Sequence, residues 1–187
     1  MKSDLDLLRL VRRGDPDGAA GLFQKYSQPL LRFADRMLSN RAEAEEVSQE
    51  VFLKMITRVE QFDGRAAVSS WLYAIAANAC RDRLRHSKRA VVVPLEAVAE
   101  APSKETGAEN SIHERQRRLA VRRALSQLSD EQREALILAR YHGMPYAEIA
   151  RTLEITEGAV KTRIFRAIET LKEVFSEGGS QWNAMTS

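Results

Sequence analysis

The last segment of the sequence with helical periodicity carries basic and aromatic side chains on one face. Apolar residues recur every three or four positions between Val160 and Phe175, which predicts a helix with one buried stripe after an N-cap at Thr156. The other face, here called the basic face, consists of Lys161, Thr162, Arg163, Phe165 and Arg166, with Arg163 at its border. Arg and Lys read guanine edges or bind phosphates, and a thymine methyl group is an apolar partner for an exposed ring. This face is a candidate for reading duplex DNA.

A short helix and a tight turn precede this helix. Pro145 and Tyr146 open the short helix, which continues past Ile149, and a turn after Ile155 leads into the longer helix. This layout is typical of a helix-turn-helix, whose second helix enters the major groove. The alternative is an ordinary amphipathic helix with a solvated basic face, and this segment alone leaves that alternative open.

A second candidate face lies on a helix predicted over about residues 70–86. Trp71, Asn78 and Arg85 are spaced by sevens and share a stripe, with Arg81 beside them; we call these four residues the Trp71 stripe. A ring, an amide and two guanidinium groups suit stacking and hydrogen bonding to unpaired bases, with neutralisation of phosphates. The alternative is a helix end enriched in Arg because cations favour the negative end of the dipole, which leaves the amide and the ring unexplained.

A third face is acidic. Glu46, Gln49, Glu50 and Leu53 fall at i, i+3, i+4 and i+7 of a predicted helix, opposite its apolar stripe. An exposed leucine beside two acids and an amide suits docking of a basic helical partner. An ordinary solvated helix face explains this pattern, here called the acidic face, equally well.

The sequence lacks the residue groupings that catalysis or metal binding needs. Its histidines, His86, His113 and His142, lie far apart, and it has neither a paired-cysteine spacing nor a Gly-rich phosphate loop. Cys80 falls at an inward helix position, which favours a buried structural thiol over a nucleophile. We therefore predict no catalytic residue, no metal site and no cofactor.

Composition indicates a soluble cytoplasmic protein. The 187 residues are 44% hydrophobic and 29% charged, with a formal net charge of +3. A single cysteine cannot form an internal disulfide, which fits a reducing compartment. We find no apolar signal core and no run long enough for a membrane helix, so no membrane insertion is expected.

Periodicity predicts an all-α protein with two small helical domains joined by a flexible linker. Helical patterns fill residues 1–89, where Pro29 is expected to kink or split the second helix. The pattern stops over residues 90–111, which contain two prolines and a glycine. Residues 112–176 form the second domain, which contains the helix-turn-helix, and residues 177–187 form a tail.

Taken together and in register, the three faces resemble the extracytoplasmic-function (ECF) sigma factors of bacterial RNA polymerase. The motifs are AEEVSQEVF at residues 44–52, SWLYAIAAN running into RDRLR at residues 70–85, and LSDEQR, YAEIA and VKTRIFRA between residues 128 and 167. The resemblance implies a non-enzymatic sigma factor that binds core RNA polymerase and directs transcription initiation from a specific set of promoters.

The same resemblance implies a role for each face. The acidic face would dock on the β′ clamp, and the Trp71 stripe would recognise and melt the −10 element of promoter DNA. Residues 62–70 and Asn78 would shape a pocket for a flipped-out −10 base. The second domain would bind the β flap and use the basic face on the −35 element. An anti-sigma factor is expected as a further partner.

Two other classes of protein would account for part of this pattern. A stand-alone helix-turn-helix regulator would bind DNA without polymerase, but it offers no role for the acidic face or the Trp71 stripe. An enzyme of nucleic-acid metabolism would need a metal or nucleophile constellation, which the sequence lacks. Co-purification with core polymerase separates the sigma factor from both alternatives.

Overall fold

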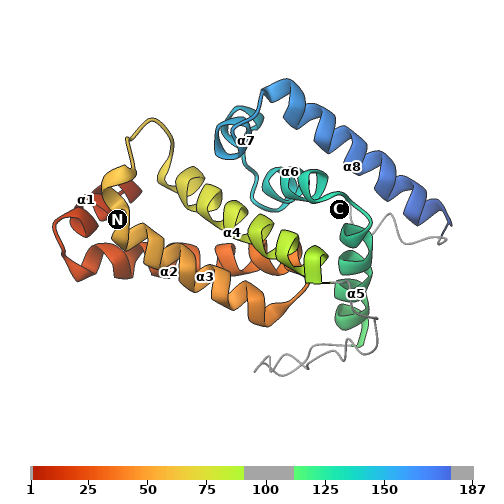
Figure 1. Cartoon of the computed structure of the whole chain (residues 1–187), viewed down its shortest axis with the longest axis horizontal. Helices are drawn as coiled ribbons and strands as arrows, with labels where there is room; N and C mark the ends of the chain where they lie inside the picture. The colour runs from red at the N-terminus through yellow and green to blue at the C-terminus, as the bar shows by residue number, and fades with distance from the viewer. Residues whose placement is uncertain (1, 91–111, 178–187) are drawn as a thin grey trace.

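The structure, a computed structural model, describes residues 2–90 and 112–177. These residues form helices and no strand, which confirms the predicted all-α class (Figure 1). In chain order the helices are α1 (Asp4–Arg12), α2 (Pro16–Leu38), α3 (Arg41–Thr57), the 3-10 helix η1 (Val59–Gln61), α4 (Val68–Ala90), α5 (Ile112–Ser126), α6 (Asp130–Tyr141), α7 (Tyr146–Leu153) and α8 (Glu157–Glu177). Except for Ala90 and Glu177, the predicted linker and tail lie outside the described residues.

Helix ends fall where the sequence supplies capping residues. Ser3 and Ser129 each form a capping box with the residue three positions on, so that two backbone N–H groups gain partners. Gly14 lies in the connection between α1 and α2. Its φ of 72° is a left-handed backbone conformation, which residues with a side chain disfavour. The hydroxyl of Thr156 accepts a hydrogen bond from the N–H of Ala159 at 3.1 Å and caps α8, as predicted.

Pro29, where the sequence predicts that the helix is kinked or split, lies inside one continuous helix, so α2 is not split there. Proline has no N–H to donate to the carbonyl of residue 25, and the helix loses one internal bond. The side chains of Leu22, Leu30 and Phe33, on either side of the proline, are fully buried. Tertiary burial of this face therefore outweighs the local cost of the proline.

The first domain is built around α2, which packs along α3 and α4 (Figure 1). Apolar side chains from all three helices fill its centre, where Phe33, Met37, Val47, Met55 and Leu72 are fully buried. Cys80 is also fully buried in this core, and burial raises the pKa of its thiol to about 12. The predicted structural role of this cysteine is consistent with that burial.

The second domain places α7 and α8 against α6. Ile137, Leu138, Ile149, Val160 and Ala167 are buried at its centre. Arg133 is buried too, and it donates hydrogen bonds to the carbonyl oxygens of Leu125 at 2.9 Å and Leu128 at 3.2 Å. These bonds fasten the turn between α5 and α6 to the core of the domain.

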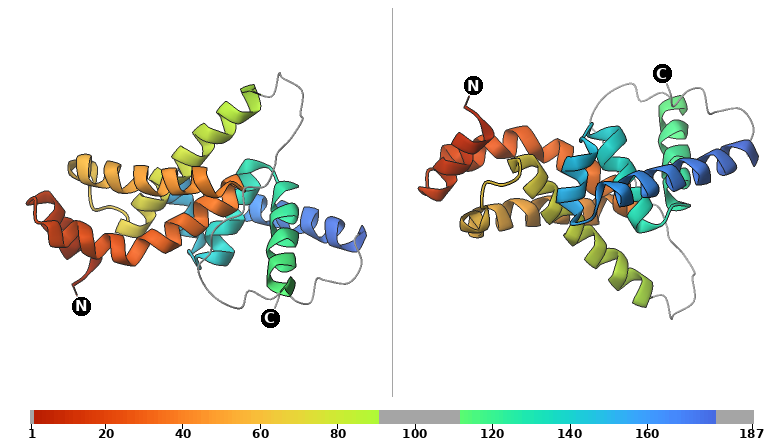
Figure 2. Two further views of the ribbon diagram at one scale, coloured as in Figure 1. Left: turned by 90° about the horizontal axis from the view of Figure 1, so that it is seen from below. Right: turned by 90° about the horizontal axis from the view of Figure 1, so that it is seen from above.

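The two domains pack against each other, which the sequence did not predict. Helix α4 contacts α7, and α2 contacts α6 (Figure 2). The ring of His142 packs on those of Tyr73 and Phe33, with centroids 4.7 and 6.0 Å apart. Arg133 adds a third hydrogen bond, to the carbonyl oxygen of Met37 in the first domain at 2.6 Å. The domains are thus distinct in sequence but joined in space.

Candidate functional site

The helix-turn-helix predicted from the sequence is present in α7 and α8. The chain leaves α7 through Glu154, whose φ of 55° is left-handed, and the N–H of Ile155 donates to the carbonyl of Ala150 at 2.9 Å. This tight closure turns the chain directly to the cap at Thr156. Three residues therefore separate the two helices.

The basic face lies on α8 where the periodicity placed it. Lys161, Thr162, Phe165 and Arg166 are exposed, and Arg163 is half-buried. The ring of Phe165 is 65% exposed, the largest exposed fraction among the large hydrophobic side chains of the described residues. A single exposed apolar side chain is ordinary on a protein surface, so this ring gains significance only from its basic neighbours on the second helix of the helix-turn-helix. The Thr162 hydroxyl donates to the carbonyl of Gly158 at 2.9 Å, so it is partly engaged.

The Trp71 stripe runs along α4, and its members have different surroundings. Asn78 is exposed, and its side-chain oxygen accepts a hydrogen bond from the guanidinium of Arg81. Arg85 is exposed and pairs with Asp82 one turn away. Trp71 is half-buried, with its ring 5.4 Å from that of Phe62. The structure brings Asn78 and Arg81 together, whereas Trp71 lies nearer the loop before α4.

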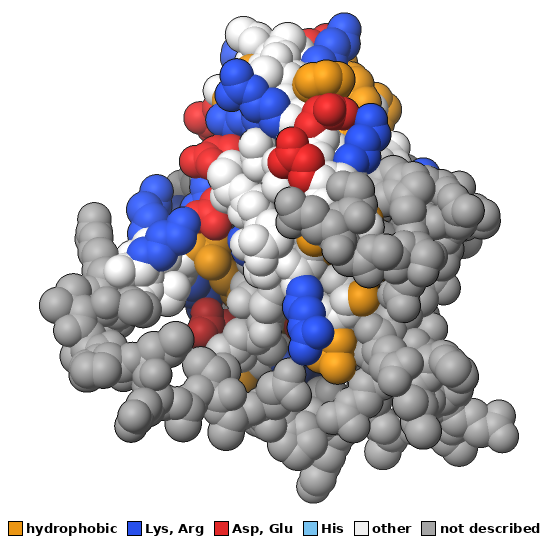
Figure 3. All heavy atoms as spheres, turned by 90° about the vertical axis from the view of Figure 1, so that its right-hand side faces the viewer, with side chains coloured by type: hydrophobic (Ala, Val, Ile, Leu, Met, Phe, Trp, Pro, Cys, Tyr) orange, Lys and Arg blue, Asp and Glu red, His pale blue; other side chains and the backbone are white. Residues whose placement is uncertain are grey.

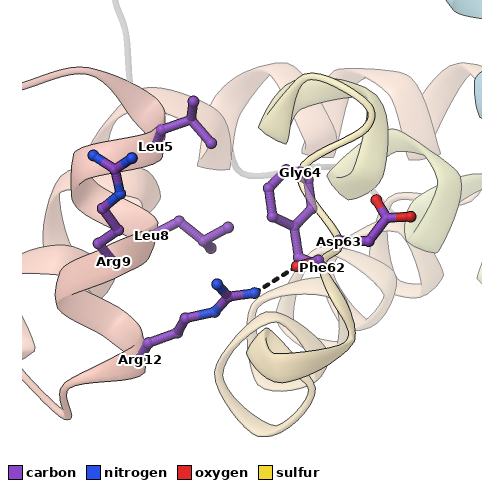
Figure 4. A pocket seen from close by; sticks show the side chains of 7 residues that line it. All are labelled: Leu5, Leu8, Arg9, Arg12, Phe62, Asp63 and Gly64. Carbon is purple, nitrogen blue, oxygen red and sulfur yellow. Dashed lines mark hydrogen bonds between the residues drawn. The ribbon is translucent and has the colours of Figure 1, made fainter.

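That loop is held in place by an arginine that sequence reasoning missed. The guanidinium of Arg12, from α1, donates to the carbonyl oxygen of Phe62 (Figure 4). It also donates to the carbonyl oxygen of Val59 at 3.2 Å. Leu8 and Phe62 are buried beside a cavity of about 280 Å³ between α1 and the loop. In the sequence, Arg12 is an ordinary cation in the last turn of a helix, where it would favour the negative end of the helix dipole. Its neighbours in the sequence therefore do not indicate its contact with a loop some 50 residues away.

The acidic face is on α3, and three of its four members are exposed. Leu53 is 63% exposed, and Glu46 and Gln49 also face solvent. Glu50 is half-buried, and it forms ion pairs with Lys54 at 2.5 Å and with Arg83 of α4 at 3.0 Å; Glu46 is also paired with Arg83, at 3.7 Å. Partial burial opposes ionisation of Glu50, but these two cations outweigh it and lower the pKa of the carboxyl group. The prediction that Glu50 lies in an open face is corrected accordingly.

A buried carboxylate lies between the domains, and the sequence analysis did not single it out. Glu134 of α6 is 0% exposed, and burial raises its pKa to about 7, although Arg81 and Arg163 act in the opposite direction. The Nε of Arg81 is 3.7 Å from Glu134, close enough for attraction but too far for a hydrogen bond. Glu134 precedes the core residues Ile137 and Leu138 by three and four positions. This helical spacing, which predicts a position on the buried side of α6, could have identified it.

Surface charge, hydropathy and the placement of possible metal ligands add three observations. Over the described part of the face in Figure 3, Lys and Arg side chains alternate with Asp and Glu, so this face is not a uniform basic field. No helix within residues 2–90 or 112–177 combines the length and apolarity needed to cross a bilayer. In the same residues, no three His, Cys, Asp or Glu side chains are grouped as metal ligands.

Comparison with known families defines the class of protein. Residues 22–90 match the family described as Sigma-70 region 2, and residues 118–171 match Sigma-70, region 4. The chain therefore belongs to the sigma-70 family, whose members are non-catalytic transcription initiation factors, and within it to the ECF sigma factors. It is a sigma factor that directs transcription initiation at specific promoters.

Individual relatives agree with this placement. The ECF RNA polymerase sigma factor SigM of Mycobacterium tuberculosis is 36% identical over 166 residues, which cover 89% of this chain and 81% of SigM. A solved structure of CnrH in complex with the cytosolic domain of CnrY matches with a TM-score of 0.73 at 21% identity, over 95% of this chain and all of CnrH, and it supports the fold. The sigma factor RpoE of Bartonella quintana, solved in complex with the anti-sigma factor NepR, matches with a TM-score of 0.64 at 26% identity, over 82% of this chain and 94% of RpoE.

Proposed function

We propose that this sigma factor uses three separate faces, one for core polymerase and two for promoter DNA. The acidic face of α3 binds the β′ clamp, the Trp71 stripe of α4 reads the −10 element, and the basic face of α8 reads the −35 element. Residues 1–89 form the first domain, 90–111 the linker, 112–176 the second domain, which also binds the β flap, and 177–187 the tail. The protein has no catalytic activity of its own and acts in the cytoplasm.

The exposure of Phe165 carries this proposal furthest. A phenylalanine that is 65% exposed, between Lys161 and Arg166 on the second helix of a helix-turn-helix, fits contact with base methyl groups and phosphates in a major groove. An exposed apolar side chain also supports polymerase docking by the acidic face, because Leu53 is exposed beside the exposed Glu46 and Gln49. The complex of the related RpoE with NepR supports an anti-sigma factor as a further partner of this chain.

The test combines co-purification and transcription. The purified chain is mixed with core RNA polymerase, and gel filtration measures the assembly of holoenzyme. Run-off transcription is then measured on genomic fragments, beginning with the promoter of the protein's own gene. We expect transcripts only when both components are present. Sequence-specific DNA binding by the free chain, with no effect on core polymerase, would instead identify a stand-alone regulator.

A further inference from the structure

One guanidinium group ties the segment before α4 to the first helix. Arg12 of α1 donates to the carbonyl oxygen of Val59 from two nitrogens, at 3.2 and 3.4 Å, and to that of Phe62. Its Nε also lies 3.8 Å from the carboxylate of Glu60. All these acceptors belong to η1 or to the residue that follows it, so a single planar fork fixes the end of this short helix.

Helix α1 is itself held tightly against α2, which gives Arg12 a fixed support. A Cβ atom added to Gly18 of α2 would come within 2.5 Å of the carbonyl oxygen of Leu7, so only glycine allows the two backbones to approach this closely. Asp4 of α1 also accepts a hydrogen bond from the hydroxyl of Tyr26 of α2 at 2.5 Å. Helix packing, and not the loop, therefore determines where the guanidinium of Arg12 lies.

The backbone that Arg12 fixes belongs to a residue whose ring contacts the Trp71 stripe. Phe62 is 5% exposed, and its ring lies 5.4 Å from that of Trp71 at an interplanar angle of 51°. Figure 4 shows the side chains of Leu8 and Phe62 pointing into the cavity between α1 and the loop. Trp71 is half-buried, so part of its surface remains available to an unpaired base.

Beyond Phe62, the loop is folded on itself. The N–H of Arg65 donates to the side chain of Asp63 at 2.9 Å, and both residues are exposed. The chain is buried again at Val68, where α4 begins. Arg12 therefore acts at the point where the loop leaves the helices and where the ring beside Trp71 is placed.

We propose that Arg12 is a positioning residue for the −10 site, which acts through Phe62 to hold the ring of Trp71 in the orientation that stacks on a promoter base. In this role the guanidinium need not touch DNA. It fixes the backbone of Phe62, and the buried ring of Phe62 supports one side of Trp71. This inference rests on the proposed function, because it requires that the Trp71 stripe reads the −10 element.

Fluorescence of the free, full-length chain tests whether Arg12 positions Trp71. The sequence has two tryptophans, so Trp182→Phe leaves Trp71 as the sole emitter. Arg12→Met removes the hydrogen-bond donors of the side chain, and we expect acrylamide to quench Trp71 more strongly, with a red shift of the emission. Arg9→Met is the matched control, because Arg9 lines the same cavity but is 66% exposed and pairs only one turn away, with Asp6. This control should leave both signals unchanged.

Holoenzyme binding tests whether this orientation serves the −10 site. The template is the promoter of the protein's own gene, already melted over the −10 element, and equal amounts of assembled holoenzyme are compared. Arg12→Met should weaken binding about three- to tenfold, which is part of the loss expected when a stacked base loses its ring. Adding Arg12→Met to Trp71→Ala should cause no further loss, because the ring through which Arg12 acts is already missing. Arg12→Lys should lose less, since its ammonium can still donate to one of the two carbonyl oxygens.

Two results would overturn the proposal: unchanged quenching of Trp71 in Arg12→Met, or losses of affinity that add in the double variant. If Arg12→Met failed to fold, the same two measurements on Arg12→Lys would decide the question. A different result separates the proposed function from this inference. If Trp71→Ala bound the melted template as tightly as the wild type while Arg12→Met still altered the fluorescence, the −10 role of the stripe would fail, and Arg12 would have no site to position.

Discussion

Replacing Glu134 by Gln should stabilise this protein at neutral to alkaline pH, contrary to the usual effect of changing a buried residue. The carboxyl group is fully buried without a hydrogen-bond donor, and its pKa rises from an ordinary value of 4.5 to about 7. Burial is the main cause, and the attraction of Arg81 at 3.7 Å compensates only part of it. Gln has nearly the same shape and cannot ionise, so the variant removes the cost of the charge alone.

The sign and size of the effect follow from proton linkage. A raised carboxyl pKa means that the folded state holds the proton more tightly than the unfolded state. Stability is therefore highest when both states are protonated, below about pH 4.5, and falls as the pH rises to about 7. A rise of this size corresponds to about 3 kcal/mol. Glu134→Gln should increase the free energy of unfolding by up to this amount at about pH 8, and by little at about pH 4.5.

His142 shifts stability in the opposite direction, so the comparison must be made between variant and wild type. Burial, followed by Arg36 and Arg32, lowers the pKa of His142 from 6.5 to about 4. Its contribution is complete above about pH 6.5 and is lost as the pH falls through 4. Both proteins contain His142, so their difference in stability isolates Glu134.

The assay is urea unfolding followed by circular dichroism at several pH values between about 4.5 and 8. The difference between the two unfolding free energies should grow steadily with pH. A variant that is less stable than the wild type at pH 8 would show that the Arg81–Glu134 attraction outweighs burial. That result would refute the assignment of a costly carboxylate at the interface.

Three further predictions concern the proposed faces and the interface. The double substitution Glu46→Lys and Gln49→Lys should abolish holoenzyme assembly in gel filtration. It should change the unfolding free energy by less than about 1 kcal/mol, because both side chains are exposed. If the double variant assembled as well as the control Glu169→Lys, this face would be removed from consideration. Arg166→Ala should weaken holoenzyme binding to duplex promoter DNA by about 1–3 kcal/mol if Arg166 contacts a base. Asn78→Ala should leave the affinity of the closed complex unchanged and reduce permanganate reactivity at the −10 element. Identical defects of the two variants on duplex and pre-melted templates would contradict the assignment of these residues to different promoter elements. Arg133→Met should destabilise the chain by more than about 2 kcal/mol in urea unfolding, because three buried carbonyl oxygens lose a charged donor; an unchanged midpoint would show that other donors replace it.

Local features of the fold were predictable because they depend on neighbouring residues. Capping at Ser3 and Ser129 and the turn before Thr156 need only a few adjacent side chains, and the exposed Phe165 follows from helical spacing. The sequence alone did not decide between a kink and a split at Pro29, because a local rule for proline does not include the burial of the residues around it.

Contacts between distant segments could not be predicted in the same way. Arg12 and Arg83 are ordinary surface arginines in the sequence, yet one holds the loop before α4 and the other pairs with Glu50 of α3. Glu134 was overlooked because acids are almost always exposed, although it lies on an apolar stripe. These partners become known only when the helices are placed in space.

The interdomain contacts also determine the order in which this protein can fold during synthesis. The hydrogen bond from Arg133 to Met37 joins residues 96 positions apart, whereas the helices of the first domain contact near neighbours in the chain. Domains fold from the N-terminus as they emerge, at about 5–20 residues per second, so α4 is complete for roughly 2–8 s before α6 begins. During that interval Glu134, which lies beside Arg81, has not yet been made. The contact between these two residues therefore forms only after the first domain is complete.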